Sequence, residues 1–182
     1  MKQFEKLATG KMSLIWGIIF ISMMVFLRTG FATYAHAGTN GNPMLEMLLI
    51  YSPQDIFDLL DAYGPEGRAF YIRTILLFDF IIPLIYSFFF TVCTIWIMKK
   101  LSMKSTWKTL AFILGIIQCL SDWIENIFLL IVTANYPNQL KFLVNLASVS
   151  TLLKAALTIF FLVIIVIGLT FLLLKNAVRK GR

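Results

Sequence analysis

The chain has 182 residues, of which 59% are hydrophobic and 14% are charged. Soluble domains contain about 45–50% apolar residues, and the excess here is gathered in long blocks, as in integral membrane proteins. The net charge of +7 comes from basic residues at the ends of these blocks, not from a basic tract with interleaved aromatics, so nucleic-acid binding is not expected. The expected localisation is the cell membrane.

The first apolar block, residues 13–35, predicts a membrane-spanning helix, because about 20 apolar residues cross a bilayer. The Ala-His-Ala tripeptide at 35–37 leaves a second interpretation open, since this pattern is typical of a signal-peptidase site. Against cleavage, the run 12–27 exceeds the ~7–15 residues of a signal-peptide core, and Arg28 begins an unusually long segment after it. We therefore expect the first span to be retained.

The connection to the next span contains an amphipathic segment, residues 44–63. Ser52 and Pro53 are typical of a helix start. The apolar side chains that follow repeat at helical spacing, namely Ile56, Leu59, Leu60 and Tyr63. The pair at 64–65, Gly-Pro, predicts the end of this helix. The polar face carries Asp55, Asp58 and Asp61. Because an acidic face suits anionic lipids poorly, we expect a lid packed on the bundle rather than a surface anchor.

Three further apolar blocks predict spans at 71–98, 107–134 and 142–174. Pro83 lies inside the first of these, so a kink is expected near Asp79. The last block is longer than a bilayer requires and is expected to tilt or project. Residues 1–182 are thus predicted to form a single membrane domain, an all-α four-helix transmembrane bundle with a short extracytoplasmic amphipathic helix.

Basic residues indicate how the bundle is oriented. They gather before the first span, between the second and third, and after the fourth, as Lys2, Lys6, Lys11, Lys99, Lys100, Lys104, Lys108, Lys175, Arg179, Lys180 and Arg182. Because cytoplasmic loops carry the excess of lysine and arginine, both termini are expected in the cytoplasm. The acidic connection 36–68 is then extracytoplasmic.

Ionisable residues inside the predicted spans are the main functional signal. They are Asp79, Asp122, Glu125 and Lys154. A charge at the centre of a spanning helix is disfavoured by roughly 2.5–3.5 kcal/mol, so such residues face one another or a wet cavity. At ~1.5 Å per residue, three of the four lie ~12–18 Å from the outer ends of their helices, and Asp122 lies near the middle. The overlapping depths and shared polar faces predict one interior site.

Two interpretations of this interior site stay open. As a chemical site, Asp122 and Glu125 form the acid/base pair, Asp79 tunes them, and Lys154 stabilises charge. As a packing network, the same groups hold the helices together. Three carboxylates against one lysine leave excess negative charge. That excess requires either a protonated carboxyl group or an arginine that reaches inward, for which the candidates are Arg28 and Arg73.

Several neighbouring residues are candidates for binding. Tyr86, Asn126 and Asn145 follow the polar faces of their helices. Arg68 and Arg73 lie beside aromatic residues at the outer interface, where they can hold a phosphate headgroup. Ordinary interfacial anchoring is the alternative for these two arginines.

We predict neither a metal nor another cofactor. The carboxylates at 79, 122 and 125 provide oxygen ligands for a hard cation, but Lys154 in the same layer competes with it. Zinc is disfavoured because no histidine or cysteine accompanies them. Cys93 and Cys119 do not form a CxxC pair and are expected to be small core residues.

The leading hypothesis is a small integral-membrane enzyme that acts on a lipid-like or isoprenoid-like molecule by acid–base chemistry. A non-enzymatic binding, assembly or immunity-type membrane protein with a structural ion-pair network is the first alternative. A proton-coupled carrier is the second, and with four spans it would need to oligomerise. The expected partner is a membrane lipid or a lipid-like small molecule, and a homo-oligomer is left open.

Overall fold

The computed structural model describes residues 2–180, in which every regular element is a helix. Arg182, used above to predict the orientation, lies outside the described residues, as do the side chains of Arg179 and Lys180. Four helical stretches are long and apolar enough to cross a membrane, namely Gly10–Gly38, Pro53–Lys100, Ser105–Ala134 and Lys141–Lys175. The prediction of an all-helical chain with four span-like helices is therefore confirmed.

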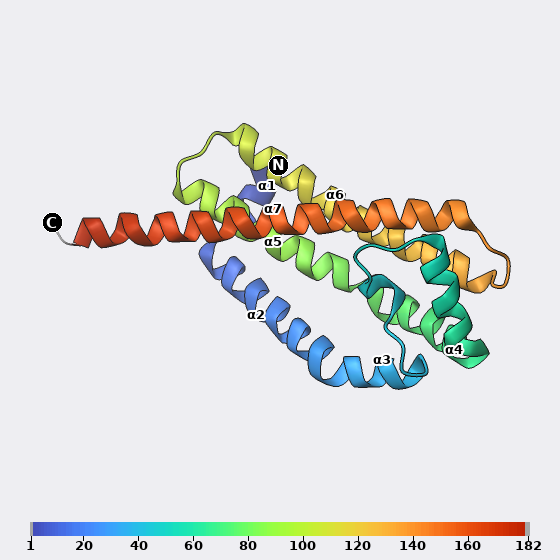
Figure 1. Cartoon of the computed structure of the whole chain (residues 1–182). Helices are drawn as coiled ribbons and strands as arrows, with labels where there is room; N and C mark the ends of the chain where they lie inside the picture. Colours follow the sequence, from blue (N-terminus) through green and yellow to red (C-terminus); the bar gives the residue numbers. More distant parts are fainter. Residues whose placement is uncertain (1, 181–182) are drawn as a thin grey trace.

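The first stretch leans away from the rest of the bundle (Figure 1). A short helix, α1 (Lys2–Leu7), precedes α2 (Gly10–Phe26), a π-helical turn η1 (Leu27–Phe31) and α3 (Ala32–Gly38). The side chain of Thr9 caps α2 by accepting from the backbone N–H of Met12 at 3.2 Å. Helix α2 packs mainly against α5 (Ile82–Lys100), where Phe20 stacks on Phe89 with ring centroids 4.9 Å apart. Most apolar side chains of α2 remain exposed.

The connection between α3 and α4 (Pro53–Thr74) is mostly non-helical. Only a short 3-10 turn, η2 (Leu45–Met47), interrupts it, so the predicted amphipathic segment 44–63 becomes helical only from Pro53. The helix start predicted at Ser52 and Pro53 is confirmed. A capping box forms there, because the Ser52 side chain accepts from Asp55 N–H while the Asp55 carboxylate accepts from Ser52 N–H. Gly64, at φ 65°, breaks α4 into two halves, and helix resumes at once after it.

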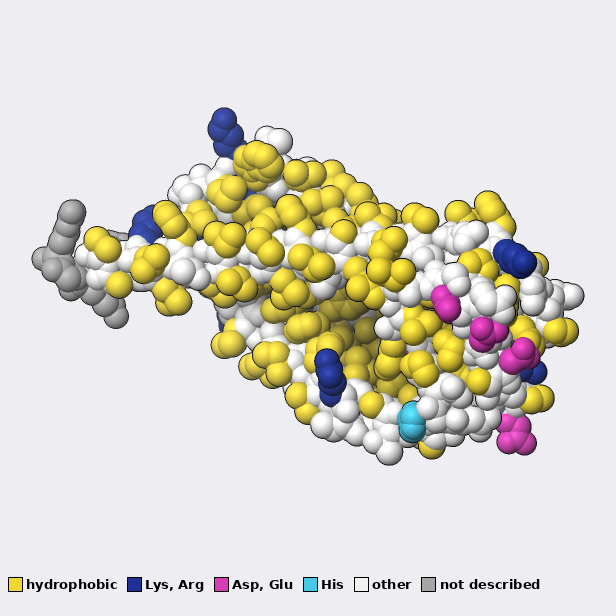
Figure 2. Space-filling model, viewed as in Figure 1, with side chains coloured by type: hydrophobic (Ala, Val, Ile, Leu, Met, Phe, Trp, Pro, Cys, Tyr) yellow, Lys and Arg dark blue, Asp and Glu magenta, His cyan; other side chains and the backbone are white. Residues whose placement is uncertain are grey.

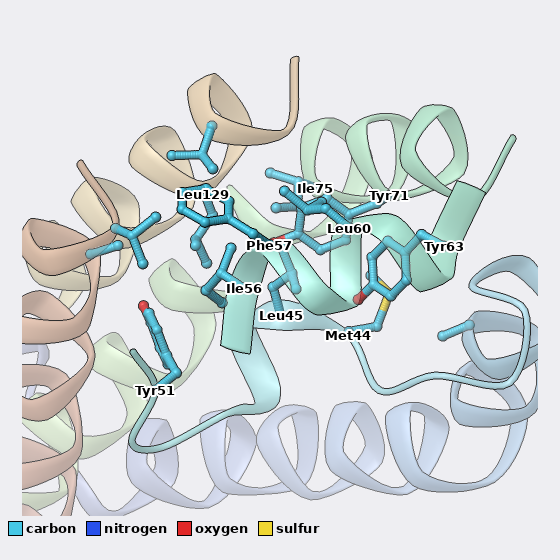
Figure 3. Packing of buried hydrophobic residues seen from close by; sticks show 14 of the residues in the cluster. Met44, Leu45, Tyr51, Ile56, Phe57, Leu60, Tyr63, Tyr71, Ile75 and Leu129 are labelled. Carbon is cyan, nitrogen blue, oxygen red and sulfur yellow. The ribbon is translucent and has the colours of Figure 1, made fainter. Parts of the chain in front are cut away.

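The first half of α4 packs on the bundle, as predicted for a lid. Its buried face carries Ile56, Phe57, Leu60 and Tyr63. These side chains lie in one hydrophobic cluster with Leu129 of α6 (Ser105–Ala134) and Val144 of α7 (Lys141–Lys180) (Figure 3). The acidic residues Asp55, Asp58 and Asp61 are exposed on the opposite face.

The second span is interrupted at the expected place. After α4, a π-helical turn, η3 (Ile75–Asp79), leads into a two-residue break before α5. Pro83 lies in the first turn of α5 and lacks the N–H of a continuous helix. The kink predicted near Asp79 is confirmed.

Helices α5, α6 and α7 form the tightest part of the bundle. A Cβ atom on Gly115 of α6 would lie 1.9 Å from Thr91 Oγ1 of α5, and one on Gly168 of α7 would lie 2.4 Å from Ile97 Cγ2 of α5. Glycine at these two positions therefore allows a close helix approach, as is common between membrane helices. With 40 residues, α7 is ~60 Å long and exceeds a hydrocarbon core of ~30 Å.

Candidate functional site

Lys154 of α7 lies between two carboxylates of α6. Its Nζ is 2.5 Å from Glu125 Oε2 and 3.3 Å from Asp122 Oδ1. Positions 122 and 125 lie about one turn apart on α6, so both face α7. Glu125 is fully buried and Asp122 is 7% exposed. The structure thus joins three of the four ionisable residues that the sequence placed at one depth.

Tyr86 of α5 extends this network, because its hydroxyl donates to Asp122 Oδ2 at 2.6 Å. Asn126 donates to Asp122 Oδ1 at 3.1 Å. Asp122 therefore has contacts with side chains from all three central helices. Tyr86 and Asn126, both predicted as binding residues, lie in the same interior network.

Side chains of α6 also donate hydrogen bonds to backbone carbonyls at the helix break between η3 and α5. Asn126 Nδ2 donates to the carbonyl of Asp79 at 3.0 Å, and Trp123 Nε1 donates to the carbonyl of Phe80 at 3.0 Å. These carbonyls lie at the break between η3 and α5. The break also brings Asp79 close enough to Asp122, Glu125 and Lys154 for their charges to interact. Polar groups of α6 thus both stabilise the break and position the fourth predicted residue.

Several polar atoms of the site have no hydrogen-bond partner among the described residues. They include Asp79 Oδ2, Glu125 Oε1, Asn126 Oδ1, Gln118 Oε1 and the Tyr71 hydroxyl. Tyr71 and Glu125 are both fully buried. Buried polar groups are normally satisfied, so these atoms retain the capacity to bond to a further polar group.

Glu46, which we did not predict as a site residue, belongs to the same neighbourhood. It lies in η2, its Oε2 is buried without a partner, and its charge interacts with those of Lys154 and Glu125. Burial raises the pKa of Glu46 from 4.5 to about 7, although the nearby Tyr71 and Lys154 oppose the shift. A single acid within the apolar run 44–51 was the available signal in the sequence.

Other predicted binding residues lie elsewhere. Asn145 is exposed on α7. Arg68 donates to the Leu60 carbonyl at 2.6 Å and stacks over the Tyr136 ring at 4.7 Å from its centroid. Arg73 is exposed and bonds to the carbonyl of Ala69 in its own helix.

The excess negative charge of the site is not balanced by arginine, because Arg28 is exposed like Arg73. Within the described residues, no group of three or more His, Cys, Asp or Glu side chains is arranged to hold a metal ion. Cys93 and Cys119 are buried free thiols.

Comparison of the chain with protein-family models, with curated proteins and with solved structures finds no match. The arguments for function therefore come from the geometry of the site itself.

Proposed function

We propose that the chain is an integral membrane protein that crosses the bilayer four times, with both termini in the cytoplasm and residues 36–68 outside. The contacts at one end support this orientation. Lys99 donates to the carbonyls of Glu5 and Ala8, and Lys108 pairs with Glu5 at 3.3 Å, so α1 and the basic α5–α6 loop share that end. Exposed acidic side chains gather at the end opposite to the C-terminus (Figure 2). This separation of charge follows the positive-inside rule.

We infer that the interior site acts on a lipid-like or isoprenoid-like molecule by acid–base chemistry. Asp122 and Glu125 act as the acid/base pair, with one accepting a proton from the substrate while the other returns one. The net proton balance is zero, as in an isomerisation or a hydrogen exchange. Lys154 stabilises whichever of the two carboxyl groups is ionised, and Asp79 tunes the proton affinity of both Asp122 and Glu125.

The observation that carries this proposal is the combination of a tight ion pair with unpartnered buried oxygens. A network that only held helices together would be expected to satisfy its members, because a half-satisfied network is less stable than an apolar core. Here Glu125 pairs with Lys154 through Oε2 and leaves Oε1 free and fully buried. A free carboxylate oxygen beside a fixed cation is suited to proton transfer.

A purely structural network is the second candidate, and one observation favours it. Asn126 and Trp123 bind the carbonyls at the helix break, which is a stabilising role independent of any ligand. The two candidates differ in what they predict for Glu125 and Asp122, whose loss would impair chemistry in one case and only folding in the other.

Hydrogen exchange into lipid separates the two candidates. The full-length protein, in nanodiscs containing a total lipid extract supplemented with isoprenoid alcohols and quinones, is incubated in D2O, and the lipids are analysed by mass spectrometry. We expect deuterium or a rearranged product in one lipid class with the wild type and with the exposed-site control Asp58→Asn. Glu125→Gln and Asp122→Asn should lose the signal while remaining folded.

An unchanged lipid profile with folded wild-type protein would overturn the enzymatic proposal. Equal losses of thermal stability and signal in the two variants would favour the structural network.

A further inference from the structure

The charge of the interior site points to the kind of molecule that it binds. The carboxyl groups of Glu46, Asp79 and Glu125 lie within interaction distance of one another, and those of Asp79 and Glu125 are also within that distance of Asp122. Lys154 is the one basic side chain among the described residues that pairs with any of them. Burial raises the pKa of Glu46, and a positively charged group would stabilise the ionised form of this carboxyl group inside a low-dielectric site.

A second observation concerns the polar groups around this cluster. The Tyr71 hydroxyl is fully buried and lies beside the Glu46 carboxyl group, and Glu125 Oε1, also fully buried, has no hydrogen-bond partner among the described residues. Tyr71 is also close enough to Asp79 and Glu125 for their charges to interact. Carboxylates surrounded by tyrosine rings are a favourable environment for an ammonium group, through both ionic and cation–π contacts.

Segment 39–52 covers this part of the site. Its first part is tied to α4, where Asn40 donates to the Tyr63 carbonyl at 2.7 Å and Tyr63 donates to the Pro43 carbonyl. Its last part is tied to α7, where Ser148 donates to the Tyr51 carbonyl at 3.3 Å and Tyr51 bonds to Thr151 at 2.9 Å. The turn at 40–41, with φ values of 54° and 82°, precedes the part that carries Glu46.

The middle of segment 39–52 has an exposed apolar side and a buried acidic side. Met47, Leu49 and Ile50 are 56%, 56% and 79% exposed, whereas Glu46 Oε2 is buried. The segment therefore presents apolar side chains outward and the carboxyl group of Glu46 inward.

An apolar hollow lies beside this segment. Figure 2 shows it between α2 and α7, with hydrophobic side chains on its walls. It exists because α2 packs mainly on α5 and diverges from α7 (Figure 1). A chain of methylene groups is complementary to such walls.

We propose that the site binds the positively charged headgroup of an amphiphile. The apolar chain of this molecule lies in the hollow between α2 and α7. Segment 39–52 moves to admit the headgroup and then closes, which places Glu46 against it. The proposal rests on the proposed function, since it names the class of molecule on which that site acts.

Thermal unfolding with amphiphiles of one chain length and different charge tests the proposal. The full-length protein in phosphatidylcholine nanodiscs is titrated with hexadecyltrimethylammonium, hexadecanol or hexadecyl sulfate, which share one chain and differ in charge. The quaternary ammonium is used because its charge does not change with pH. We expect a saturable rise in Tm with the cation alone.

Glu46→Gln provides the residue-specific arm, and Glu66→Gln, at an exposed position of α4, is its matched control. Loss of one ionic contact should weaken the apparent affinity for the cation about tenfold in Glu46→Gln and leave it unchanged in Glu66→Gln. Wild-type affinity should rise between pH 6 and pH 8, as Glu46 ionises. The other titratable groups that face Glu46 are Tyr63, Tyr71, Asp79, Glu125 and Lys154. They are common to the wild type and Glu46→Gln, so the difference between the two pH profiles is caused by Glu46.

Equal Tm shifts with all three amphiphiles would overturn the proposal, as would equal affinities of Glu46→Gln and Glu66→Gln. If Glu46→Gln does not fold, the comparison of amphiphiles on the wild type still decides whether the site selects a cation. Selective cation binding without deuterium exchange would support this class of ligand and reject the enzymatic proposal, so the protein would be a binding protein. Deuterium exchange without cation selectivity would retain the enzyme and reject this class of ligand.

Discussion

Lys154 and Glu125 form the shortest ion pair among the described residues, with Nζ 2.5 Å from Oε2. The pair links α7 to α6 at a fully buried carboxylate, where water does not screen the interaction. Removal of Lys154 leaves Glu125 buried without an ionic partner, whereas removal of Glu125 leaves Lys154 paired with Asp122 alone, so Lys154 and Glu125 are expected to be coupled energetically.

Lys154→Met should lower the free energy of unfolding by about 3–5 kcal/mol, because it leaves buried carboxylates unpaired. The double variant with Glu125→Gln should lose less than the sum of the two single losses. Lys108→Met, which removes the partly exposed pair with Glu5, is the control and should cost under about 1 kcal/mol. Denaturant unfolding in detergent compares the four variants (Lys154→Met, Glu125→Gln, their combination and Lys108→Met) with the wild type, and strict additivity at 154 and 125 would contradict the coupling.

The stability of the protein should depend on pH through Glu46. Its folded pKa of about 7 exceeds the unfolded value of 4.5, so the folded state holds this proton more tightly. Stability is therefore lost as pH rises through this window, by roughly 3 kcal/mol once Glu46 is ionised. Glu46→Gln should be more stable than the wild type at pH 8 and show a flatter profile between pH 5 and pH 8. Glu66→Gln should follow the wild type, and parallel profiles for Glu46→Gln and the wild type would exclude this explanation.

Gly115 is a test of close packing between α5 and α6. Its Cβ in Gly115→Ala would meet Thr91 Oγ1 at 1.9 Å, which forces the helices apart. We expect a loss of about 1–3 kcal/mol, as for other overpacked sites. Gly30→Ala is the matched control, since its Cβ would have no atom nearer than 3.9 Å. Thermal unfolding in detergent compares the two variants, and equal melting temperatures would rule out the tight contact.

Cysteine labelling tests the orientation. Asp58→Cys and Lys104→Cys place thiols at exposed positions of α4 and of the α5–α6 loop, while the native thiols are buried. A membrane-impermeant maleimide should label position 58 in intact cells and position 104 only after permeabilisation. The reverse pattern would invert the bundle.

The helices and part of the site could be predicted from the sequence because their signals are local. Apolar runs located the four span-like helices, and Ser52 with Asp55 located the start of α4. Helical spacing also placed Asp122 and Glu125 on one face, and depth brought Lys154 to the same layer. These inferences need only the geometry of a helix and the length of a span.

Glu46 could not be placed in the same way, because its burial depends on how a non-helical segment folds against three helices. The apolar residues of the run 44–51 do not repeat at a helical or strand spacing that would indicate which side chain points inward. The packing of α2 mainly on α5 was equally inaccessible, since an almost uniformly apolar helix does not identify the face that contacts a neighbour.

The length of α7 gives its ion pair a mechanical consequence. Lys154 lies about 13 residues, or ~20 Å, from Lys141 at the start of α7 and about 26 residues, or ~39 Å, from Lys180. If the ion pair acts as a fulcrum, a tilt of this rigid helix displaces its C-terminal end about twice as far as its N-terminal end. Any rearrangement around Glu125 and Asp122 is thereby amplified at the far end of the helix.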